Sequence, residues 1–359
     1  MWKHKRAVDN HIAQEMAEDD VPGVAVAVLE GGEFTYTRGF GHADIADDVW
    51  LDSGHVLRWA SISKAAGGAL TMRLHEQGAL QRDDPVRDHA TGLAVQHSAT
   101  FEQLAANRGC VRHYANNESS TLEDVDAVQW EKEKTTDSQL AQTWYPDAAT
   151  AVEEFDDDPL RSYDSGTDTV STTCVPGASS LYSTHGYTVL GAGLEAATGR
   201  TVEQLVREEI SEPLGLDTLR QEQITDTSVR RATLYTGADN DAADPDETTW
   251  KTLGGGVESD IRDLARFGRA VVQGQVYADT EYVWNGGANG WSYAYGWGTY
   301  TQDGHRAAAK NGGQLGSDTH LIVYPDDDVV VAVMINRAEL TDPADHATDI
   351  AEYIGELIL

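Results

Sequence analysis

The chain has 359 residues and a mass of 39.0 kDa, enough for one large domain or two closely packed ones with a hydrophobic core that needs no disulfides or metals. Sixty acidic residues against 26 basic ones give a formal net charge of −34, which argues against DNA, RNA or an anionic membrane as a partner. The longest apolar run, Val329 to Ile335, has the length of a strand, so no membrane span is predicted.

The N-terminal part of the chain is expected to form a helix followed by a hairpin. Residues 4–18 carry apolar side chains at helical spacing. Segment 23–29 carries valine at every second position, segment 33–39 alternates polar and apolar side chains, and Gly31-Gly32 joins them with a pair that suits a tight turn. These two segments are therefore predicted to be antiparallel strands.

The middle of the chain is mainly helical in pattern. A helix is predicted from Ser61 to about Gly78, where the sequence reads SISKAAGGALTMRLHEQG. Further helical segments alternate with long polar loops and lie at 187–198, 201–210 and 259–273. The acid-rich stretches 153–158 and 239–247 lack the spacing of a calcium loop, so they are expected to be solvated loops.

Strand patterns return after Gly290, and the chain closes with a helix. The predicted strands lie at 292–300, 305–311, 317–324 and 328–335, and the helix at about 343–358. Because strands occur at both ends, we expect an α/β (α+β) fold with one antiparallel sheet built from both chain ends and flanked by the terminal helices. Residues 1–58 and 290–359 would form this sheet domain, residues 59–289 would form an inserted, mainly α-helical domain, and the active-site cleft would lie between them.

The first motif that can carry chemistry is the S-x-x-K tetrapeptide Ser61-Ile62-Ser63-Lys64. A helix that starts at Ser61 puts Lys64 one turn later on the same face, within reach of the hydroxyl, and leaves the Ser61 N–H without a partner in the helix. A nucleophile, its base and half of an oxyanion hole would then arise together. The alternative is a helix cap with a solvated lysine, but a cation at this end opposes the helix dipole.

The second motif is Tyr182-Ser183-Thr184, which stands just before a predicted helix. Tyrosine can shuttle protons beside cations that favour the phenolate, and the motif lysines would supply them. An ordinary half-buried core tyrosine is the alternative. Tyr114-Ala115-Asn116 spells the more usual Y-x-N triplet, but no helix pattern follows it, so we interpret Tyr114 as part of a cleft-lining loop.

The third motif is Lys310-Asn311-Gly312-Gly313 at the end of a predicted strand. The lysine offers a positive charge, and the glycines let a substrate lie against the strand edge. A hairpin turn with a surface lysine is the alternative. In the order S-x-x-K, Tyr, K-x-G, the three motifs together favour a catalytic site more strongly than each does alone.

The balance of acidic residues, lysine and arginine also indicates the kind of solution to which the protein is adapted. Only seven lysines occur against 19 arginines. Carboxylates hold water and cations, whereas a lysine stem exposes apolar surface, so an acid-rich and lysine-poor chain suits concentrated salt. The sequence therefore predicts a halophilic protein, with an ordinary acidic protein as the alternative.

The cysteines and the N-terminus leave the compartment open. Cys110 and Cys174 are too few for a disulfide framework or a zinc site, although one bridge between them is possible. The first twenty residues are charged and have no apolar core, so no signal peptide is expected in this chain. The protein would be cytoplasmic, or exported with its leader removed.

The three motifs resemble those of the serine β-lactamase and penicillin-binding-protein superfamily, in its class C β-lactamase-like, S12 peptidase-like branch. Further stretches similar to that branch include VPGVAVAVLEGG, LHEQGALQRDDPV and VYPDDDVVVAVMINR. The segments RGCVRHY at 108–114 and YSTHGYT at 182–188 look closest to the mitochondrial serine β-lactamase-like protein and its bacterial relatives, which are regarded as peptidases. The resemblance spans nearly the whole chain and implies a β-lactamase/transpeptidase-like fold.

The resemblance also implies a mechanism. Ser61 would attack an amide or ester carbonyl, Lys64 and Tyr182 would move its proton, and Lys310 would bias their pKa values. The oxyanion would lie between the backbone N–H groups of Ser61 and Gly313, and neither a metal nor an organic cofactor is implied. The weaker candidates for substrate contact are Thr184, Asn311, Gly312, Tyr114, His113 and His185.

The substrate is expected to be a small molecule or peptide, while the oligomeric state stays open. A peptidase or D-peptidase is the first interpretation, with β-lactamase and carboxylesterase as rivals within the same chemistry. Thr184 stands where class C β-lactamases have asparagine, and Asn311 where they have threonine or serine, which argues against efficient β-lactam turnover. A non-catalytic scaffold that keeps the fold is the alternative of another class.

Overall fold

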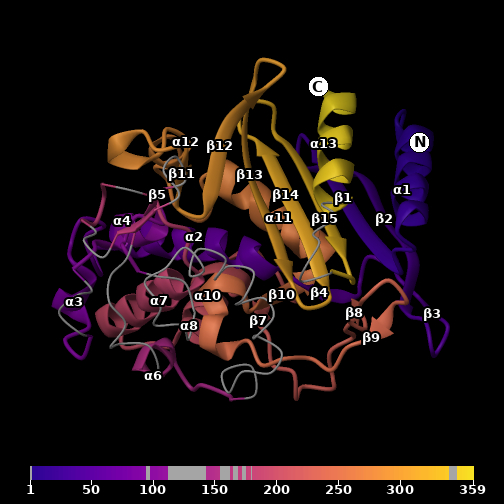
Figure 1. Ribbon diagram of the computed structural model, residues 1–359. Coiled ribbons are helices and arrows are strands. Elements are labelled where there is room, and N and C mark those ends of the chain that lie inside the picture. The colour runs from indigo at the N-terminus through magenta and orange to yellow at the C-terminus, as the bar shows by residue number, and fades with distance from the viewer. Residues whose placement is uncertain are drawn as a thin grey trace.

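The computed structural model describes residues 2–93, 98–111, 143–153, 162–164, 169–171, 175–178, 180–338 and 346–359. Its main feature is an eight-stranded antiparallel sheet with the strand order β11-β12-β13-β14-β15-β1-β2-β3 (Figure 1). The strands are β1 (Gly23–Glu30), β2 (Glu33–Asp44), β3 (Val49–Trp50), β11 (Tyr293–Ala294), β12 (Trp297–Gln302), β13 (His305–Gln314), β14 (Ser317–Tyr324) and β15 (Val329–Ile335).

The two ends of the chain meet in the middle of this sheet, where β1 pairs with β15 from Val24↔Ile335 to Glu30↔Val329. Every residue of β15 is buried, because helices cover both faces of the sheet at this point. Alternate side chains of β1 therefore enter two different cores. Val24 belongs to the core under the terminal helices, and Ala25 to the core on the other face.

The terminal helices α1 (Lys5–Glu18) and α13 (His346–Ile358) lie together on one face of the sheet (Figure 1). They bury apolar side chains such as Ile12 and Ile350 against it. Helix α11 (Ile261–Val272) covers the other face, where Leu264 and Phe267 are fully buried. Asp260 starts α11 by accepting hydrogen bonds from two N–H groups of its first turn, which is the usual role of an N-cap aspartate.

The remaining helices lie between β4 and β11 in the sequence and pack beside the sheet (Figure 1). The helices that bear on the site are α2 (Ser63–Glu76), α4 (Phe101–Ala105), α6 (Ala148–Glu153), α7 (Thr184–Thr198), α8 (Val202–Leu205) and α10 (Thr252–Gly255). The others are α3 (Val86–His89), α9 (Glu212–Leu214) and α12 (Thr280–Trp284). Helices α2, α7 and α10 pack on one another, and they bring residues more than a hundred positions apart into contact.

A small second sheet has the order β4-β10-β7 and connects these helices to the large sheet. It consists of β4 (Val56–Arg58), β7 (Arg220–Gln221) and β10 (Val257–Asp260), and β4 leads directly into the segment that carries Ser61. The sequence did not indicate these strands, because two to four residues are too few to show an alternation. Two further hairpins pair β5 (Ser162–Asp164) with β6 (Thr169–Ser171) and β8 (Tyr235–Thr236) with β9 (Asp241–Ala242).

The predicted fold class is confirmed, since both chain ends contribute to one antiparallel sheet flanked by the terminal helices. Most element ends shift by a few residues, and α7 begins at Thr184 because Ser183 caps it. The single strand predicted at 292–300 is wrong, because the chain turns between β11 and β12, which pair with each other. The segment predicted as a helix at 201–210 includes the π-helical turn Val206–Ser211. The division into domains at 59–289 stays a prediction. Within the described residues, no helix combines the length and apolar character needed to cross a bilayer.

Candidate active site

Ser61 lies in a single 3-10 turn, Ala60–Ile62, between β4 and α2. The α-helix itself begins at Ser63, two residues later than the sequence indicated. The preceding residue, Ala60, is fully buried and has a φ of +47°, in the left-handed region that alanine rarely adopts. Such a conformation persists only where the surroundings hold it, so the backbone before Ser61 is fixed from outside the turn.

Lys64 is fully buried in the first turn of α2 and its ammonium group is surrounded by oxygen atoms. Its Nζ lies 3.1 Å from Ser61 Oγ, 3.3 Å from Thr184 Oγ1 and 2.6 Å from the carbonyl oxygen of Gly254. Thr184 and Gly254 come from α7 and α10, so three helices orient this one amine. The Gly254 carbonyl was not indicated by the sequence, because a backbone oxygen carries no residue-type signal.

Tyr182 also reaches Ser61, and its Oη lies 2.6 Å from Ser61 Oγ. The ring also lies 4.7 Å from Lys64 Nζ, measured to the ring centroid. The side chain is 37% exposed, so the phenol is open to solvent and to substrate. Ser61 Oγ therefore has both an amine and a phenol within hydrogen-bond distance, from segments 121 residues apart.

Asn107 holds the segment that carries Tyr182. Its carbonyl oxygen accepts a hydrogen bond from the N–H of Leu181 at 2.7 Å, and its side-chain Oδ1 accepts one from the N–H of Ser183 at 3.1 Å. Asn107 is 4% exposed and has a φ of +53°, which asparagine tolerates better than most residues. Sequence reasoning missed this residue. An asparagine before a glycine-containing turn is a weak signal for it.

Lys310 completes the set from β13 and points toward Tyr182, with its Nζ 5.4 Å from the centroid of that ring. The Nζ donates a hydrogen bond to the carbonyl oxygen of Asn311 at 2.8 Å. Burial lowers the pKa of the Lys310 ammonium and the positive charge of Lys64 lowers it further, although Tyr182 acts in the opposite direction. Lys310 thus adds positive charge near the phenol.

The two glycines after Asn311 have different surroundings. A Cβ on Gly312 would lie 2.7 Å from the backbone N of Ser61 and 2.7 Å from the carbonyl oxygen of Trp59, closer than real Cβ atoms come. A Cβ on Gly313 would meet nothing within 4 Å. Gly312 is therefore where the strand touches the Ser61 turn, and Gly313 faces open space.

The edge of β13 that carries these residues is accessible. Its ladder with β12 runs from Gln302↔His305 to Gly298↔Ala309, whereas the ladder with β14 continues to Gln314. Among the described residues, no strand pairs with the other edge of residues 310–314. The backbone N–H of Gly313, predicted as the second oxyanion donor, belongs to this part of the strand.

The weaker site predictions have mixed outcomes. Thr184 contacts Lys64 and is 8% exposed, and Asn311 is exposed beside Lys310. His185 is 2% exposed within the first turn of α7. His113 and Tyr114 lie outside the described residues, as does Cys174, whereas Cys110 is buried. Among the residues that the structure does describe, no group of three or more His, Cys, Asp or Glu side chains is placed to hold a metal ion.

Comparison with known proteins gives one family match, to the family described as "Beta-lactamase", over residues 8–354. Penicillin-binding protein 4 of Amycolatopsis lactamdurans is 25% identical over 366 residues, covering 95% of this chain and 87% of that protein. The human mitochondrial serine beta-lactamase-like protein LACTB is 25% identical over 298 residues. That alignment covers 72% of this chain, which spans only about half, 54%, of the human protein's length.

Solved structures share the fold over nearly the whole chain. The octameric penicillin-binding protein homologue from Pyrococcus abyssi superimposes with a TM-score of 0.78 at 20% identity, covering 98% of this chain and 76% of that one. A D-stereospecific amidohydrolase from Streptomyces gives a TM-score of 0.72 at 20% identity, covering 98% of both chains. At this level of identity the structural likeness establishes the fold.

Proposed function

Because the chain belongs to the beta-lactamase family of serine hydrolases, we propose that it cleaves amide or ester bonds through an acyl-enzyme formed on Ser61. The observation that carries the proposal is the position of Ser61 Oγ, 3.1 Å from Lys64 Nζ and 2.6 Å from Tyr182 Oη. A serine hydroxyl is a weak nucleophile until a neighbouring base takes its proton. Here two candidate bases lie within the distance that proton transfer needs.

In the proposed reaction Ser61 Oγ attacks the carbonyl carbon while its proton passes to Lys64 or Tyr182. As a neutral amine, Lys64 keeps two donors, which suit the Gly254 carbonyl and the Thr184 hydroxyl, and has one lone pair for the Ser61 proton. Tyr182 is the more exposed of the two bases, so it is the better placed to give the proton to the leaving group. Water then hydrolyses the ester on Ser61 and restores the starting state.

The negative charge that develops on the substrate oxygen needs donors that are already in place. We assign these to the backbone N–H groups of Ser61 and Gly313. The close approach of Gly312 to the Ser61 nitrogen supports this assignment, because it keeps the two segments side by side. Lys310 adds a positive charge beside Tyr182, where it favours the phenolate and attracts an acidic group of a substrate.

For the substrate we propose a peptide-like amide, cleaved as a peptidase or D-peptidase would. The support is the likeness to penicillin-binding protein 4 and to a D-stereospecific amidohydrolase, together with an exposed strand edge that can hold an extended chain. Thr184 is turned toward Lys64, and Asn311 is exposed beside Lys310. Class C β-lactamases carry other residues at both positions, so we expect slow turnover of β-lactams.

Covalent labelling tests the nucleophile. A fluorophosphonate probe or a fluorescent penicillin should label the protein in high salt, and the label should be absent from Ser61→Ala. Ser63→Ala is the matched control, because Ser63 is a fully buried serine of the same motif whose Oγ accepts from the N–H of Val257. Failure of the wild-type protein to take either label would support a scaffold that keeps the fold without the chemistry.

A panel of rates tests the substrate class. The panel would contain nitrocefin, p-nitrophenyl acetate and butyrate, and D- and L-aminoacyl p-nitroanilides. We expect the highest kcat/KM for an aminoacyl anilide, with a preference for the D-series. Faster turnover of nitrocefin would assign the chain to the β-lactamases, and turnover of the nitrophenyl esters alone would assign it to the carboxylesterases.

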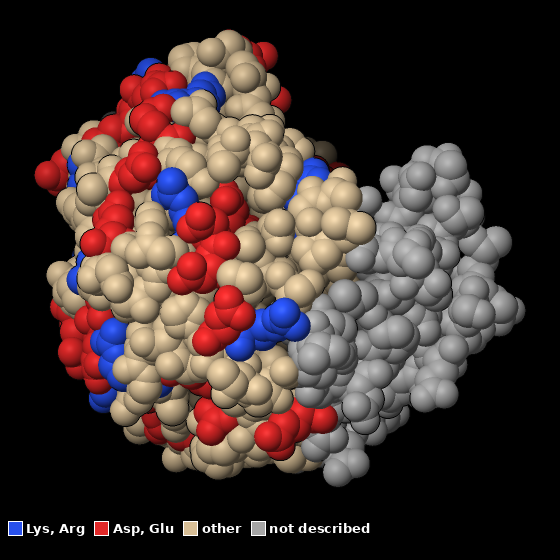
Figure 2. Space-filling model, turned by 90° about the vertical axis from the view of Figure 1, so that its left-hand side faces the viewer, with Lys and Arg blue, Asp and Glu red and all other residues tan. Residues whose placement is uncertain are grey.

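We also propose that the protein is adapted to concentrated salt. Acidic side chains are spread over the face shown in Figure 2, with basic side chains between them. Many of the arginines form ion pairs, such as Arg306 with both Glu281 and Asp326. The remaining carboxylates repel one another where salt is low, and screening by salt reduces that repulsion.

A further inference from the structure

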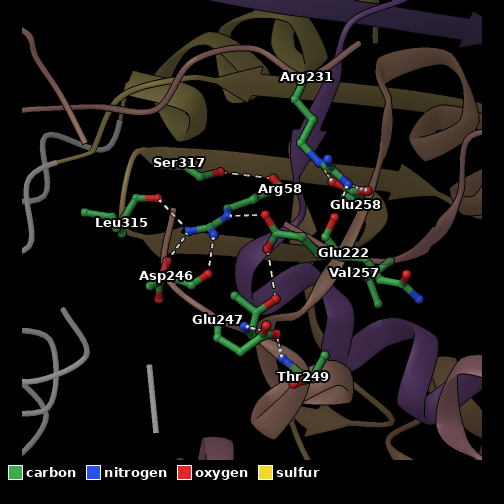
Figure 3. Close-up of polar contacts among 12 residues, drawn as sticks. Arg58, Glu222, Arg231, Asp246, Glu247, Thr249, Val257, Glu258, Leu315 and Ser317 are labelled. Atoms are coloured by element: carbon green, nitrogen blue, oxygen red, sulfur yellow. Dashed lines mark hydrogen bonds and ion pairs between the residues drawn. The ribbon is translucent and has the colours of Figure 1, made fainter. Parts of the chain in front are cut away.

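A buried group of charges, shown in Figure 3, surrounds Arg58 in the strand that leads into the Ser61 turn. Its centre is Arg58, the last residue of β4, which is 2% exposed and precedes Ser61 by three positions. The Arg58 Nε donates to Glu222 at 2.8 Å, and Nη2 donates to the carbonyl oxygen of Asp246 at 2.9 Å. Nη1 also donates to the Asp246 carboxylate. The charge of Arg58 is thus matched by two buried carboxylates.

The same guanidinium reaches the turn between β13 and β14. Nη1 lies 3.3 Å from the carbonyl oxygen of Leu315, two residues after Gly313. A second bond runs the other way, since the hydroxyl of Ser317 donates to the carbonyl oxygen of Arg58 at 3.0 Å. Figure 3 shows both bonds, with Leu315 next to the guanidinium of Arg58 and Ser317 next to its carbonyl oxygen. The strand before Ser61 and the turn after Gly313 are therefore joined by two bonds through one residue.

A third connection lies closer to Ser61. The hydroxyl of Thr319 is 3.0 Å from the carbonyl oxygen of Trp59 and 3.1 Å from that of Gly312. It therefore bridges the two segments between the Arg58 bonds and the nucleophile. Ala60, which follows Trp59, has the left-handed backbone conformation described above and needs such external support.

We propose that Arg58, with Ser317, is a positioning residue that sets the separation between the backbone N–H groups of Ser61 and Gly313. This inference rests on the proposed function, because it concerns the oxyanion hole assigned there. Stabilising an oxyanion requires donors at a narrow range of distances, and a small displacement weakens it. Arginine suits the role because its rigid fork holds two carbonyl oxygens and two carboxylates at the same time, whereas an ammonium group has only three donors and no fixed plane.

The alternative is that Arg58 only stabilises the fold. Removing one partner of a buried ion pair leaves the other charge unpaired, which destabilises a protein whether or not the pair positions an active site. Arg231 provides a matched control in the same group of charges. Its guanidinium forms two bonds of 2.7 Å with the buried carboxylate of Glu258, and its other hydrogen bonds go to the carbonyl oxygens of Gln223 and Asp226, away from the β13–β14 turn. Loss of either arginine should lower the melting temperature, whereas only loss of Arg58 should affect the oxyanion hole.

The experiment compares Arg58→Lys, Ser317→Ala and Arg231→Lys in high salt. Active sites are first counted by end-point labelling with a fluorophosphonate, so that kcat refers to folded, competent protein. We expect Arg58→Lys to lower kcat per labelled site by roughly 10- to 100-fold with KM within about threefold, less than removal of a donor costs. The Ki of phenylboronic acid, whose tetrahedral adduct occupies the hole, should rise in parallel.

The other variants decide the interpretation. We expect Ser317→Ala to show the same pattern at about 3- to 10-fold, and Arg231→Lys to keep kcat per labelled site within about twofold while lowering the melting temperature. An Arg58→Lys protein that melts earlier but keeps kcat and the boronate Ki overturns the inference. Should Arg58→Lys not fold, an unchanged kcat in Ser317→Ala overturns it equally. A wild-type protein that takes no fluorophosphonate overturns the proposed function itself.

Discussion

Two regions meet at Ser61, and they are built in opposite ways. In the nucleophile segment, residues 58–64, every residue except Ser61 is buried. Its backbone is bonded to β10 and β14, and the Arg58 side chain is bonded to the turn after β13. The Lys64 ammonium lies among oxygens from two other helices. In the strand-edge segment, residues 310–314, buried and exposed residues alternate. The ladder between β12 and β13 ends at Ala309, so the segment is not paired with β12.

The difference shows how one candidate site can meet two requirements. Proton transfer and oxyanion stabilisation need atoms fixed to within a fraction of an ångström, so the nucleophile segment is enclosed on all sides. A substrate must enter and leave, so the strand-edge segment presents backbone to solvent. Changes in the first segment should therefore act on kcat, and changes in the second on substrate binding and on the contact between the two.

The largest effect is expected from the groups around Ser61 Oγ. Ser61→Ala should remove acylation altogether, and Lys64→Ala and Tyr182→Phe should each lower kcat by at least about 100-fold, because each removes a proton acceptor. The measurement is ester or anilide hydrolysis per folded protein. Tyr300→Phe is the matched control, since Tyr300 on β12 is 38% exposed against 37% for Tyr182. Equal losses in the two tyrosine variants would contradict the proton-shuttle role.

The second effect concerns the contact between the two segments and uses neighbouring glycines. Gly312→Ala should be severe, because its Cβ would lie 2.7 Å from the Ser61 nitrogen, and we expect a loss of about 1–3 kcal/mol in stability together with most activity. The free energy of unfolding of Gly313→Ala should stay within about 0.5 kcal/mol of the wild-type value, since its Cβ meets nothing within 4 Å and neither glycine has a positive φ.

Thermal and denaturant unfolding of the two variants measures the difference directly. The same substitution one residue apart controls for the general effect of replacing glycine in a strand. A Gly312→Ala protein as stable and as active as Gly313→Ala would show that the segments are not in contact.

The third effect is on the pH profile and tests the charge of Lys310. Burial and the charge of Lys64 lower the pKa of Lys310, so its ammonium should lose its proton below the usual value of about 10.4. The alkaline fall in kcat/KM should therefore begin earlier than for an exposed lysine. Lys310→Arg, which stays charged, should move that fall to higher pH. An unmoved alkaline limb would assign the titration to another group.

The lowered pKa of Lys310 also predicts the direction in which the free energy of unfolding changes with pH. Between the lowered pKa of Lys310 and the ordinary value, the unfolded chain binds more protons than the folded one, so this residue makes stability rise with pH in that window. Lys310→Met should remove the rise. Chemical denaturation at several alkaline pH values measures it.

The smallest effect on the site should come from salt. Screening acts mainly on exposed charges, so multimolar KCl should raise the melting temperature by at least about 5 °C over low salt, roughly 4 kcal/mol in a chain of this size. The kcat per labelled site should change by less than about threefold, because the charges of the nucleophile segment are buried. Equal melting temperatures at both salt concentrations would contradict the halophilic prediction.

Much of the large sheet was predictable from local pattern. The apolar runs at 23–29 and 329–335 mark strands that the structure pairs as β1 and β15. Long strands can be detected in a sequence because a strand buried on both faces is a continuous apolar run, and a strand buried on one face alternates with a period of two residues. The short strands β4, β7 and β10 gave no such signal, although β4 places Arg58 and positions the turn that carries Ser61.

The candidate site was predictable only in its side chains. Ser61, Lys64, Tyr182 and Lys310 carry functional groups that motifs can reveal, and the structure brings all four together. The start of the helix was placed two residues too early, since the 3-10 turn depends on contacts of Trp59 and Ala60 with distant strands. Asn107, Arg58 and the Gly254 carbonyl were missed for a related reason.

The sequence by itself determined the periodicity of the strands and helices, the excess of acid, and the residue types that can attack a carbonyl. Those properties are local, because they depend on spacing along the chain and on the chemistry of each side chain. Only the tertiary structure decided which backbone atoms stand opposite which side chains. A carbonyl or an N–H is the same at every residue, so its partner is set by how helices and strands pack across more than a hundred residues.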